Sequence, residues 1–332
     1  MKSGKYKHIF QGVLVLGCVV YIIRYFIKNR QDLDLVFGLN PLILLGLGGL
    51  IVLAFLIYAL RFAIILKKCS GRKVPFYFWF KIVILGRYLN LITPQAGNIY
   101  RGVMLKKNYQ ITYTRYLSSF FSFTWIDTCL NLLLALAVIC FVQPEMEIGG
   151  LRVWVLIGVL GILVAVVPIG LEALFKRVKF QNRYAGWIHG KLSELLRVSV
   201  GSARDVRYMT KFVLTGVIAF AISIAAFYLC FLSIEVKVSL PGLALFYVVL
   251  KLSNQVIITP GNLGVREIVY GVMSEMMQIG MGQGILISVI MRIISTLVVI
   301  VLGTLFGGIG LFQKAGADLK TTNMEQPGTT GR

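Results

Sequence analysis

The phrase Leu91-Ile92-Thr93-Pro94 occurs again, nearly unchanged, as Ile257-Ile258-Thr259-Pro260. Each copy interrupts a long apolar stretch with proline and nearby glycine, the residue types least suited to a continuous helix. Pro260 follows Pro94 by 166 positions, which is half of the 332-residue chain. A polar break in membrane-length sequence should not face lipid, because its backbone groups would lack hydrogen-bond partners there. We therefore expect two buried breaks that organise the rest of the chain.

The composition indicates the class of protein around these breaks. Hydrophobic residues make up 58% of the chain and charged residues only 14%, with a mean hydropathy of +0.82. Several apolar stretches exceed the ~18 residues that mark a membrane-spanning helix. The sequence predicts an all-α polytopic membrane protein.

The formal net charge of +21 has a simple explanation in such a protein. Lysines and arginines concentrate in the loops expected on one side of the membrane, as the positive-inside rule requires. This distribution predicts cytoplasmic N- and C-termini. No nucleic-acid-binding motif accompanies the charge, so nucleic acid is not an expected partner.

Metal and cofactor chemistry has few candidate residues in this sequence. The five cysteines form no CxxC motif and fall mostly in apolar segments, which is typical of buried, unreactive thiols. The only histidines, His8 and His189, are far apart. We expect no metal site, and the sequence implies no cofactor.

We expect about six full membrane spans. They cover approximately residues 9–27, 41–66, 116–142, 153–175, 212–232 and 284–311. Pro41 suits the first turn of the second span. The loop after that span is assigned five cations: Arg61, Lys67, Lys68, Arg72 and Lys73.

Two further apolar segments, at about 76–105 and 240–279, contain the breaks. The first has about 30 residues, and at ~1.5 Å rise per residue it is too short for two crossings of a ~30 Å core. A re-entrant hairpin fits, with both arms on one side of the membrane. A full crossing by either segment would also place the basic stretch 176–211, or the tail, on the wrong side. A single kinked crossing helix is the alternative for 76–105.

The predicted elements repeat along the chain. A shift of 166 residues brings 42–66 onto 208–232 and 116–142 onto 282–308, so the order of span, hairpin and span occurs twice. The two hairpins would enter from opposite sides, which makes the repeat inverted, as in many alternating-access transporters. The expected organisation is a single transmembrane domain over 1–311, with repeats at about 42–142 and 208–308, an amphipathic cytoplasmic linker at 176–210 and a disordered cytoplasmic tail at 312–332.

Among the charged residues within these apolar segments, seven are candidates for the protein interior. Each costs several kcal/mol against lipid unless it is paired or solvated, so we expect all of them to face the protein interior. The cations exceed the anions by three. They are Arg87, Arg101, Lys251, Arg266 and Arg292, against Asp127 and Glu267.

Arginines beside polar breaks suit a phosphate group. The candidate binding groups are the five cations with the hydroxyls of Thr93 and Thr259. The candidate hinge positions, which also supply backbone amides, are Pro94, Gly97, Pro260, Gly261 and Gly264. The alternative is purely structural: Asp127 pairs with Arg292 to join two spans, and Glu267 pairs with a nearby arginine.

The residues around both breaks resemble signatures of a known family. Asn90-Leu-Ile-Thr-Pro94-x-x-Gly97-x-x-x-Arg101 resembles the first signature of the lysylphosphatidylglycerol synthase transmembrane-region family, also called the flippase-like domain family. Thr259-Pro260-Gly261-Asn262-Leu263-Gly264-Val265-Arg266-Glu267 resembles the second, and Arg292 follows it at a similar distance. The chain differs at Thr124, where many members have arginine, and at Asn262, where glycine is usual.

The resemblance implies a multi-pass protein of the bacterial or archaeal cell (inner) membrane. In the multiple peptide resistance factor, this domain moves aminoacylated phosphatidylglycerol between leaflets. The present sequence ends without the aminoacyl-transferase domain of that factor, so lipid synthesis is not expected. A membrane phospholipid or lipid-linked compound is the implied substrate.

The leading function is a lipid translocase or carrier of a phosphate-bearing amphiphile. Alternatives left open are a secondary transporter of a small anion or ion and a non-catalytic partner of a lipid-modifying enzyme. A membrane-embedded lipid transferase is less consistent with the scattered acidic residues. Homo-oligomerisation and pairing with a lipid-synthesis enzyme also stay open.

Overall fold

The computed structural model describes residues 40–91, 95–177, 190, 193, 196–197, 200–201, 205–255 and 264–307. The predicted first span at 9–27, most of the predicted linker and the predicted tail lie outside these residues. So do parts of both breaks: the described chain omits Thr93, Pro94, Thr259, Pro260 and Gly261.

The described residues confirm the all-helical class, with one short β-hairpin between two long helices. The elements of the first half are α3 (Pro41–Ser70), α4 (Phe76–Asn90), α5 (Ala96–Tyr109), α6 (Tyr113–Val142), β1 (Glu147–Ile148), β2 (Leu151–Arg152) and α7 (Val153–Arg177). Those of the second half are α9 (Val206–Leu232), α10 (Leu240–Ser253), α11 (Val265–Met276) and α12 (Met281–Leu305).

Five helices in the described part of the chain are long and apolar enough to cross a membrane. They are α3, α6, α9, α12 and the Val153–Ala173 portion of α7. These correspond to five of the six predicted spans, and the sixth is the one outside the described residues. The chain is therefore a multi-pass membrane protein. The last span, predicted to reach Leu311, ends as a helix at Leu305.

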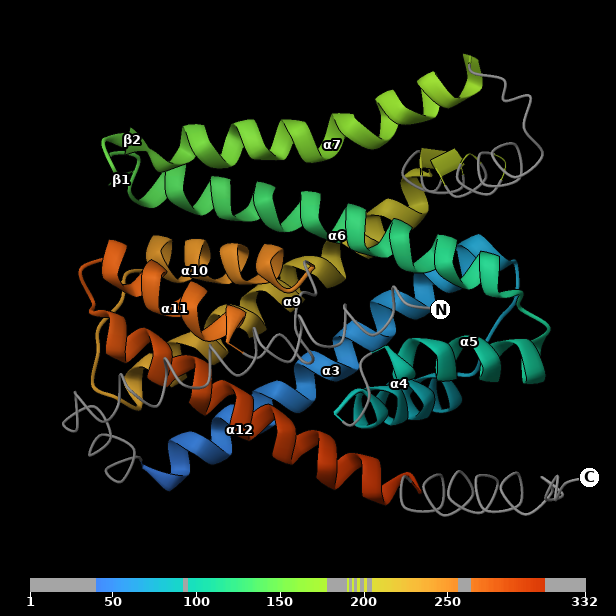
Figure 1. Ribbon diagram of the computed structural model, residues 1–332, viewed down its shortest axis with the longest axis horizontal. Helices are drawn as coiled ribbons and strands as arrows, with labels where there is room; N and C mark the ends of the chain where they lie inside the picture. The colour runs from blue at the N-terminus through green and yellow to red at the C-terminus, as the bar shows by residue number, and fades with distance from the viewer. Residues whose placement is uncertain are drawn as a thin grey trace, which may run out of the picture.

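The two halves share one order of helices, in which a long helix, two short helices and a second long helix follow one another. The long helices α3 and α6 enclose the short pair α4 and α5, and the long helices α9 and α12 enclose the short pair α10 and α11. In Figure 1, α3 and α9 cross the middle of the molecule and pack together. The α4–α5 pair lies toward one end, α10 and α11 toward the other, and α12 contacts both groups.

The starts of the long helices carry local signals. Asn40 caps α3 by accepting a hydrogen bond from Leu42 N at 2.9 Å, and Pro41 occupies the first turn. Thr112 and Asp205 cap α6 and α9 in the same way. These caps satisfy backbone N–H groups of the first turn, and so help to set where each span begins.

Glycines allow the short helices to pack closely. A Cβ atom added at Gly97 of α5 would lie 1.9 Å from the carbonyl oxygen of Gly86 in α4, so only glycine permits this crossing. Gly303 of α12 similarly packs on the ring of Tyr88. A Cβ atom added at Gly303 would lie 2.5 Å from the Cδ2 atom of that ring. The first contact closes the α4–α5 pair, and the second holds α12 against it.

Arg61 corrects the predicted topology of the second span. The sequence predicts Arg61 in a cytoplasmic loop. In the structure α3 continues to Ser70, and Arg61 lies within this helix with only 3% of its surface exposed. Its guanidinium packs over the ring of Phe212 at 4.2 Å from the centroid. The loop assignment is therefore wrong for this residue, whose charge is satisfied inside the protein.

Candidate functional site

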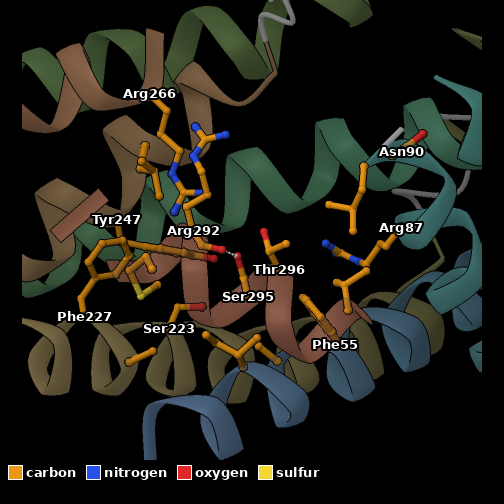
Figure 2. Close-up of a pocket in the computed structure, with 17 residues that line it drawn as sticks. Phe55, Arg87, Asn90, Ser223, Phe227, Tyr247, Arg266, Arg292, Ser295 and Thr296 are labelled. Atoms are coloured by element: carbon orange, nitrogen blue, oxygen red, sulfur yellow. Dashed lines mark hydrogen bonds between the residues drawn. The ribbon is translucent and has the colours of Figure 1, made fainter. Parts of the chain in front are cut away.

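A cavity of about 530 Å³ lies between the two halves of the molecule. Residues of six helices line it. Figure 2 shows arginines at two separate places on its wall. The first half contributes residues of α3 and α4, and the second half residues of α9, α10, α11 and α12. Leu91, which precedes the first break, and Arg266, which follows the second, both line it. Residues flanking the two breaks therefore reach one cavity.

Arg87 supplies the positive charge on the α4 side of this cavity. Its guanidinium carbon lies 4.3 Å from the ring centroid of Phe55 and 5.0 Å from that of Tyr58, both on α3. The Nε atom is buried without a hydrogen-bond partner among the described residues, and no described carboxylate forms an ion pair with Arg87. Aromatic faces partly stabilise the cation, but they leave its donors available to an anion.

Arg266 and Arg292 carry the charge on the opposite side, close to each other (Figure 2). Arg266 begins α11 and donates from Nη2 to the hydroxyl of Tyr270 at 3.0 Å. Its Nε atom is also buried without a partner in the described structure, which gives Arg266 no ion pair. A neutral hydroxyl orients this guanidinium but leaves its charge uncompensated.

Glu267 positions Arg292 and the end of the second break. Arg292 donates from Nε to Glu267 Oε1 at 2.8 Å, and its Nη2 lies 2.6 Å from the same oxygen. The other oxygen, Oε2, accepts from the backbone N–H of Gly264 at 2.7 Å. Gly264 has a φ of +81°, which favours glycine. The buried carboxylate of Glu267 thus connects Gly264, just before α11, to Arg292 of α12.

Asn90 has the corresponding place beside the first break. Its side-chain oxygen accepts a hydrogen bond from Gly97 N at 2.7 Å, across the segment that contains the break. Gln95, in between, has a φ of +66°, a left-handed conformation that non-glycine residues rarely adopt. Since Asn90 also lines the cavity, its amide links the start of α5 to the wall of the site.

Hydroxyl groups and apolar side chains complete the lining. Ser295 and Thr296 of α12 lie between the two arginine groups in Figure 2, and Ser223 and Tyr247 lie on the neighbouring helices. The apolar lining is Ile51, Ala54, Phe55, Leu91, Ala226, Phe227, Leu250, Met291 and Val299. A site with cationic groups, hydroxyls and an apolar wall suits a ligand with an anionic head and a hydrocarbon part.

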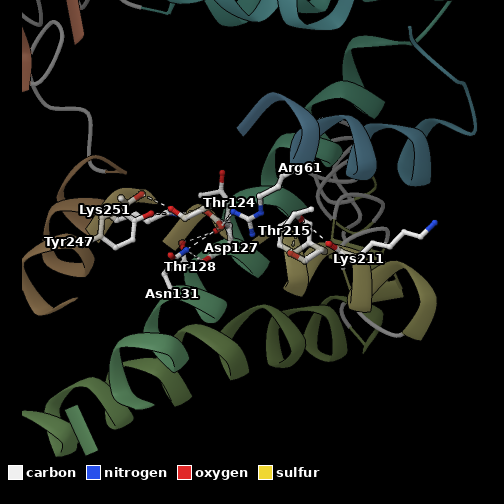
Figure 3. A network of polar contacts seen from close by, with 12 residues as sticks. Arg61, Thr124, Asp127, Thr128, Asn131, Lys211, Thr215, Tyr247 and Lys251 are labelled. Atoms are coloured by element: carbon white, nitrogen blue, oxygen red, sulfur yellow. Dashed lines mark hydrogen bonds and ion pairs between the residues drawn. The ribbon is translucent and has the colours of Figure 1, made fainter. Parts of the chain in front are cut away.

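A second polar cluster, shown in Figure 3, joins three helices. Asp127 of α6 forms ion pairs with Arg61 of α3 and Lys251 of α10. Asp127 is 2% exposed, and Asn131 donates to one of its oxygens at 3.1 Å. Next to this cluster, Gln255 of the segment before the second break donates to Thr128 at 2.5 Å.

This cluster corrects the predicted partner of Asp127. The alternative interpretation paired Asp127 with Arg292, but Arg292 binds Glu267 and Asp127 binds Arg61 and Lys251. Lys251 is consequently held by Asp127 and does not line the cavity. The pairing of Glu267 with an arginine matches the other half of that interpretation.

Arg101 also lies apart from the cavity. It is 5% exposed, and its guanidinium lies beside Gly86 in the α4–α5 contact. Its Nη2 atom is 3.4 Å from the carbonyl oxygen of Val83, and Nη1 is 3.4 Å from the Asn98 side chain. Of the five predicted binding cations, the cavity therefore brings together Arg87, Arg266 and Arg292.

Several lining residues could not be predicted from the sequence. Ser223, Tyr247, Ser295 and Thr296 sit in apolar helices where a polar residue has no recognisable motif. Arg61 did have a signal, because an arginine inside a run of apolar residues needs a buried partner. Because Arg61 lies close to Lys67 and Lys68 in the sequence, the prediction places all three in one loop.

Comparisons with known proteins agree with the resemblance seen around the breaks. The family model described as "Lysylphosphatidylglycerol synthase TM region" matches residues 9–303, which is most of the chain. No curated protein and no solved structure gives a match. The matched range contains every helix that lines the cavity, apart from the last residues of α12. The chain belongs to the lysylphosphatidylglycerol synthase transmembrane-region family.

Proposed function

We propose that this protein is a lipid translocase or carrier that moves an anionic, phosphate-bearing lipid across a cell membrane. The single observation that carries the proposal is the cavity between the two halves, in which Arg87 and Arg266 have no carboxylate partner among the described residues. An unpaired cation inside a membrane protein is costly unless an anion or water stabilises it. A lipid phosphate would accept charge-assisted hydrogen bonds from these donors.

The apolar lining supports an amphiphile over a small inorganic anion. Phe55, Phe227, Leu250, Met291 and Val299 surround the polar groups with surface that phosphate alone would not cover. A hydrocarbon chain would bury that surface. The competing function, transport of a small anion, requires only the arginines and hydroxyls, and it would show flux of inorganic phosphate without dependence on lipid.

The proposed mechanism uses the repeated order of helices. The α4–α5 and α10–α11 pairs act as re-entrant hairpins of an inverted repeat, so that the cavity opens to each side of the membrane in turn. The hydrogen bonds from Gly97 to Asn90 and from Gly264 to Glu267 anchor residues that flank the two breaks. The breaks serve as hinges, and the N- and C-termini are cytoplasmic. The chain acts as a transporter, with no chemical step on the lipid.

A leaflet-exchange experiment tests the proposal. Purified protein is reconstituted into vesicles that contain acyl-labelled fluorescent phosphatidylglycerol, and dithionite, which does not cross the membrane, reports the label in the outer leaflet. Wild type should bring inner-leaflet label to the outer leaflet faster than empty vesicles do. Arg266→Ala should lose this activity while the melting temperature in detergent stays close to that of wild type. Exchange by the folded Arg266→Ala variant at the wild-type rate would refute the assignment.

The matched control is Lys106→Gln, which removes one positive charge from the exposed surface of α5. It changes the net charge as much as the test variant does but leaves the cavity intact. Its exchange rate should equal that of wild type. A parallel measurement with radiolabelled inorganic phosphate separates lipid transport from transport of a small anion.

A further inference from the structure

The cations of the cavity form two groups on different helices. Arg87 stands on α4, and Arg266 and Arg292 stand beside the start of α11, on the other side of the hydroxyls of Ser295 and Thr296 (Figure 2). The two groups also stabilise their charges differently, through aromatic faces at Arg87 and through Tyr270 and Glu267 at the other end. The cavity therefore has two positive ends and no described carboxylate lining the space between them.

Helix α12 sets the separation of these ends. Near one end, Arg292 contacts Glu267 of α11, and near the other, Gly303 packs on Tyr88, the neighbour of Arg87. Arg292 and Gly303 are eleven positions apart, which is roughly 16 Å of helix axis at ~1.5 Å per residue. Figure 2 shows Arg87 apart from Arg266 and Arg292, on the other side of Ser295 and Thr296.

From this geometry we propose that the ligand carries two phosphate groups joined by a short polar linker, one bound at Arg87 and the other at Arg266. The proposal rests on the proposed function, and it narrows the substrate class to a diphosphorylated amphiphile, whether its two phosphates are bridged by glycerol or belong to another lipid. Ser295 and Thr296 face the linker, and the apolar lining takes hydrocarbon chains. Each phosphate is matched by a cation whose Nε atom otherwise lacks a partner.

The charge balance supports two anionic groups rather than one. A single phosphate at either end leaves the other arginine buried without a counter-charge. Arg292 is already neutralised by Glu267, so it orients the second end instead of adding a further free charge. Two phosphates compensate Arg87 and Arg266 together.

A binding comparison tests the proposal with the whole protein in detergent micelles. Cardiolipin carries two phosphates joined by glycerol, and phosphatidylglycerol with the same acyl chains carries one. Displacement of a fluorescent phosphatidylglycerol gives the affinity of each. Wild type should bind cardiolipin at least about tenfold more tightly, the gain expected from one added charge-assisted hydrogen bond. Equal affinity per molecule would overturn the proposal without any variant being made.

Single and double variants locate the two phosphates. Arg87→Gln and Arg266→Gln should each weaken cardiolipin binding about tenfold, and together about a hundredfold, because each removes one of two simultaneous contacts. The binding affinity of phosphatidylglycerol, unlike its rate of exchange, should fall little in either single variant, since its phosphate still has one end available. Phosphatidylglycerol should lose its affinity in the double variant. Lys106→Gln, on the exposed surface, should leave both affinities unchanged, which excludes nonspecific attraction to the positive surface.

The outcomes distinguish this proposal from the function on which it rests. If every variant changes the affinities of both lipids by the same factor, a single phosphate binds first at one end and then at the other. The translocase would then stand and the two-phosphate ligand would fall. If neither lipid responds to the double variant while its melting temperature is unchanged, lipid binding in this cavity is refuted and both proposals fall.

Discussion

At the scale of single residues, the buried charges divide into those that hold the structure and those that are free to bind. Asp127 joins three helices through Arg61 and Lys251, and Glu267 joins α11 to α12 through Arg292. Arg87 and Arg266, in contrast, have no ion pair among the described residues and line the cavity. The two carboxylates thus explain where the helices meet, and the two unpaired arginines of the lining give the cavity its positive charge.

Asp127→Asn should destabilise the protein strongly. The change leaves Arg61 and Lys251 facing a neutral amide, and loss of one partner from a buried ion pair costs roughly 3–5 kcal/mol. Thermal unfolding in detergent measures the effect. Glu145→Gln is the control, because its ion pair with Arg152 at 3.6 Å is exposed and should contribute less than about 1 kcal/mol. Equal effects of the two variants would contradict the structural role of Asp127.

Pocket-lining and lipid-facing positions on α12 offer a second test at this scale. Thr296→Trp should fill the cavity and stop lipid exchange, since Thr296 lines it. Leu297→Trp adds the same side chain at the next residue, which is 52% exposed on the outside of the described structure, and should leave exchange unchanged. Both rates come from the leaflet-exchange measurement. Inhibition by Leu297→Trp alone would place the lipid path on the outside of α12.

At the scale of helices, close packing depends on a few small residues. The α4–α5 pair closes where Gly97 meets the backbone of Gly86, and α12 reaches α4 where Gly303 meets Tyr88. Trp79 adds a directional contact by donating from Nε1 to the carbonyl oxygen of Ala59 in α3 at 2.9 Å. These contacts hold Arg87 at the wall of the cavity, because it lies one residue beyond Gly86.

Gly97→Ala should force α4 and α5 apart. Its Cβ would lie 1.9 Å from the Gly86 carbonyl oxygen, so the backbones must shift, at a cost of about 1–3 kcal/mol as in other overpacked sites. Gly158→Ala on α7 is the matched control, because nothing lies within 4 Å of its Cβ position. Melting temperatures of the two variants check the contrast. A Gly97→Ala variant as stable as Gly158→Ala would show that the two helices do not pack in this way.

The elements were more predictable from the sequence than their contacts. A local signal placed the start of α3 at Pro41, because proline fits the first turn of a helix. The partner of Asp127 could not be found in the same way. Arg61 is 66 positions away, and which of several cations reaches the carboxylate depends on how α3, α6 and α10 pack.

The same limit applies to the cavity. The sequence indicated that arginines beside the two breaks would bind an anion, and Arg266 does line the cavity, whereas Arg101 lies in the α4–α5 contact. Distance from a break along the chain did not separate these two residues. Their roles depend on which face of a short helix turns toward the opposite half, and that is set by tertiary packing.

At the scale of the whole molecule, one cavity lies between two halves that share the same order of long and short helices. A translocase needs such a site to open toward each membrane surface in turn. The inverted repeat that we propose would supply a reason for that exchange, because its two hairpins would enter from opposite sides.

Cysteine labelling tests the inverted repeat. Thr93→Cys and Thr259→Cys are made separately in a variant without the five native cysteines. Impermeant thiol reagents are then applied to sealed vesicles from either side. The two positions should label preferentially from opposite faces, the first from the cytoplasmic face. Preferential labelling of both from the same face would contradict the inverted arrangement.

Crosslinking of a lipid headgroup tests the central claim, that a phosphate-bearing lipid binds between the two halves, most directly. A phosphatidylglycerol analogue with a photoreactive group beside its phosphate is added to the reconstituted protein, irradiated, and mapped by mass spectrometry of the peptides. We predict adducts on the segments of α4 and α12 that carry Arg87, Ser295 and Thr296, and their loss in the Arg87→Gln/Arg266→Gln double variant. Adducts confined to the exposed surface of α7, and unchanged in the double variant, would contradict the account.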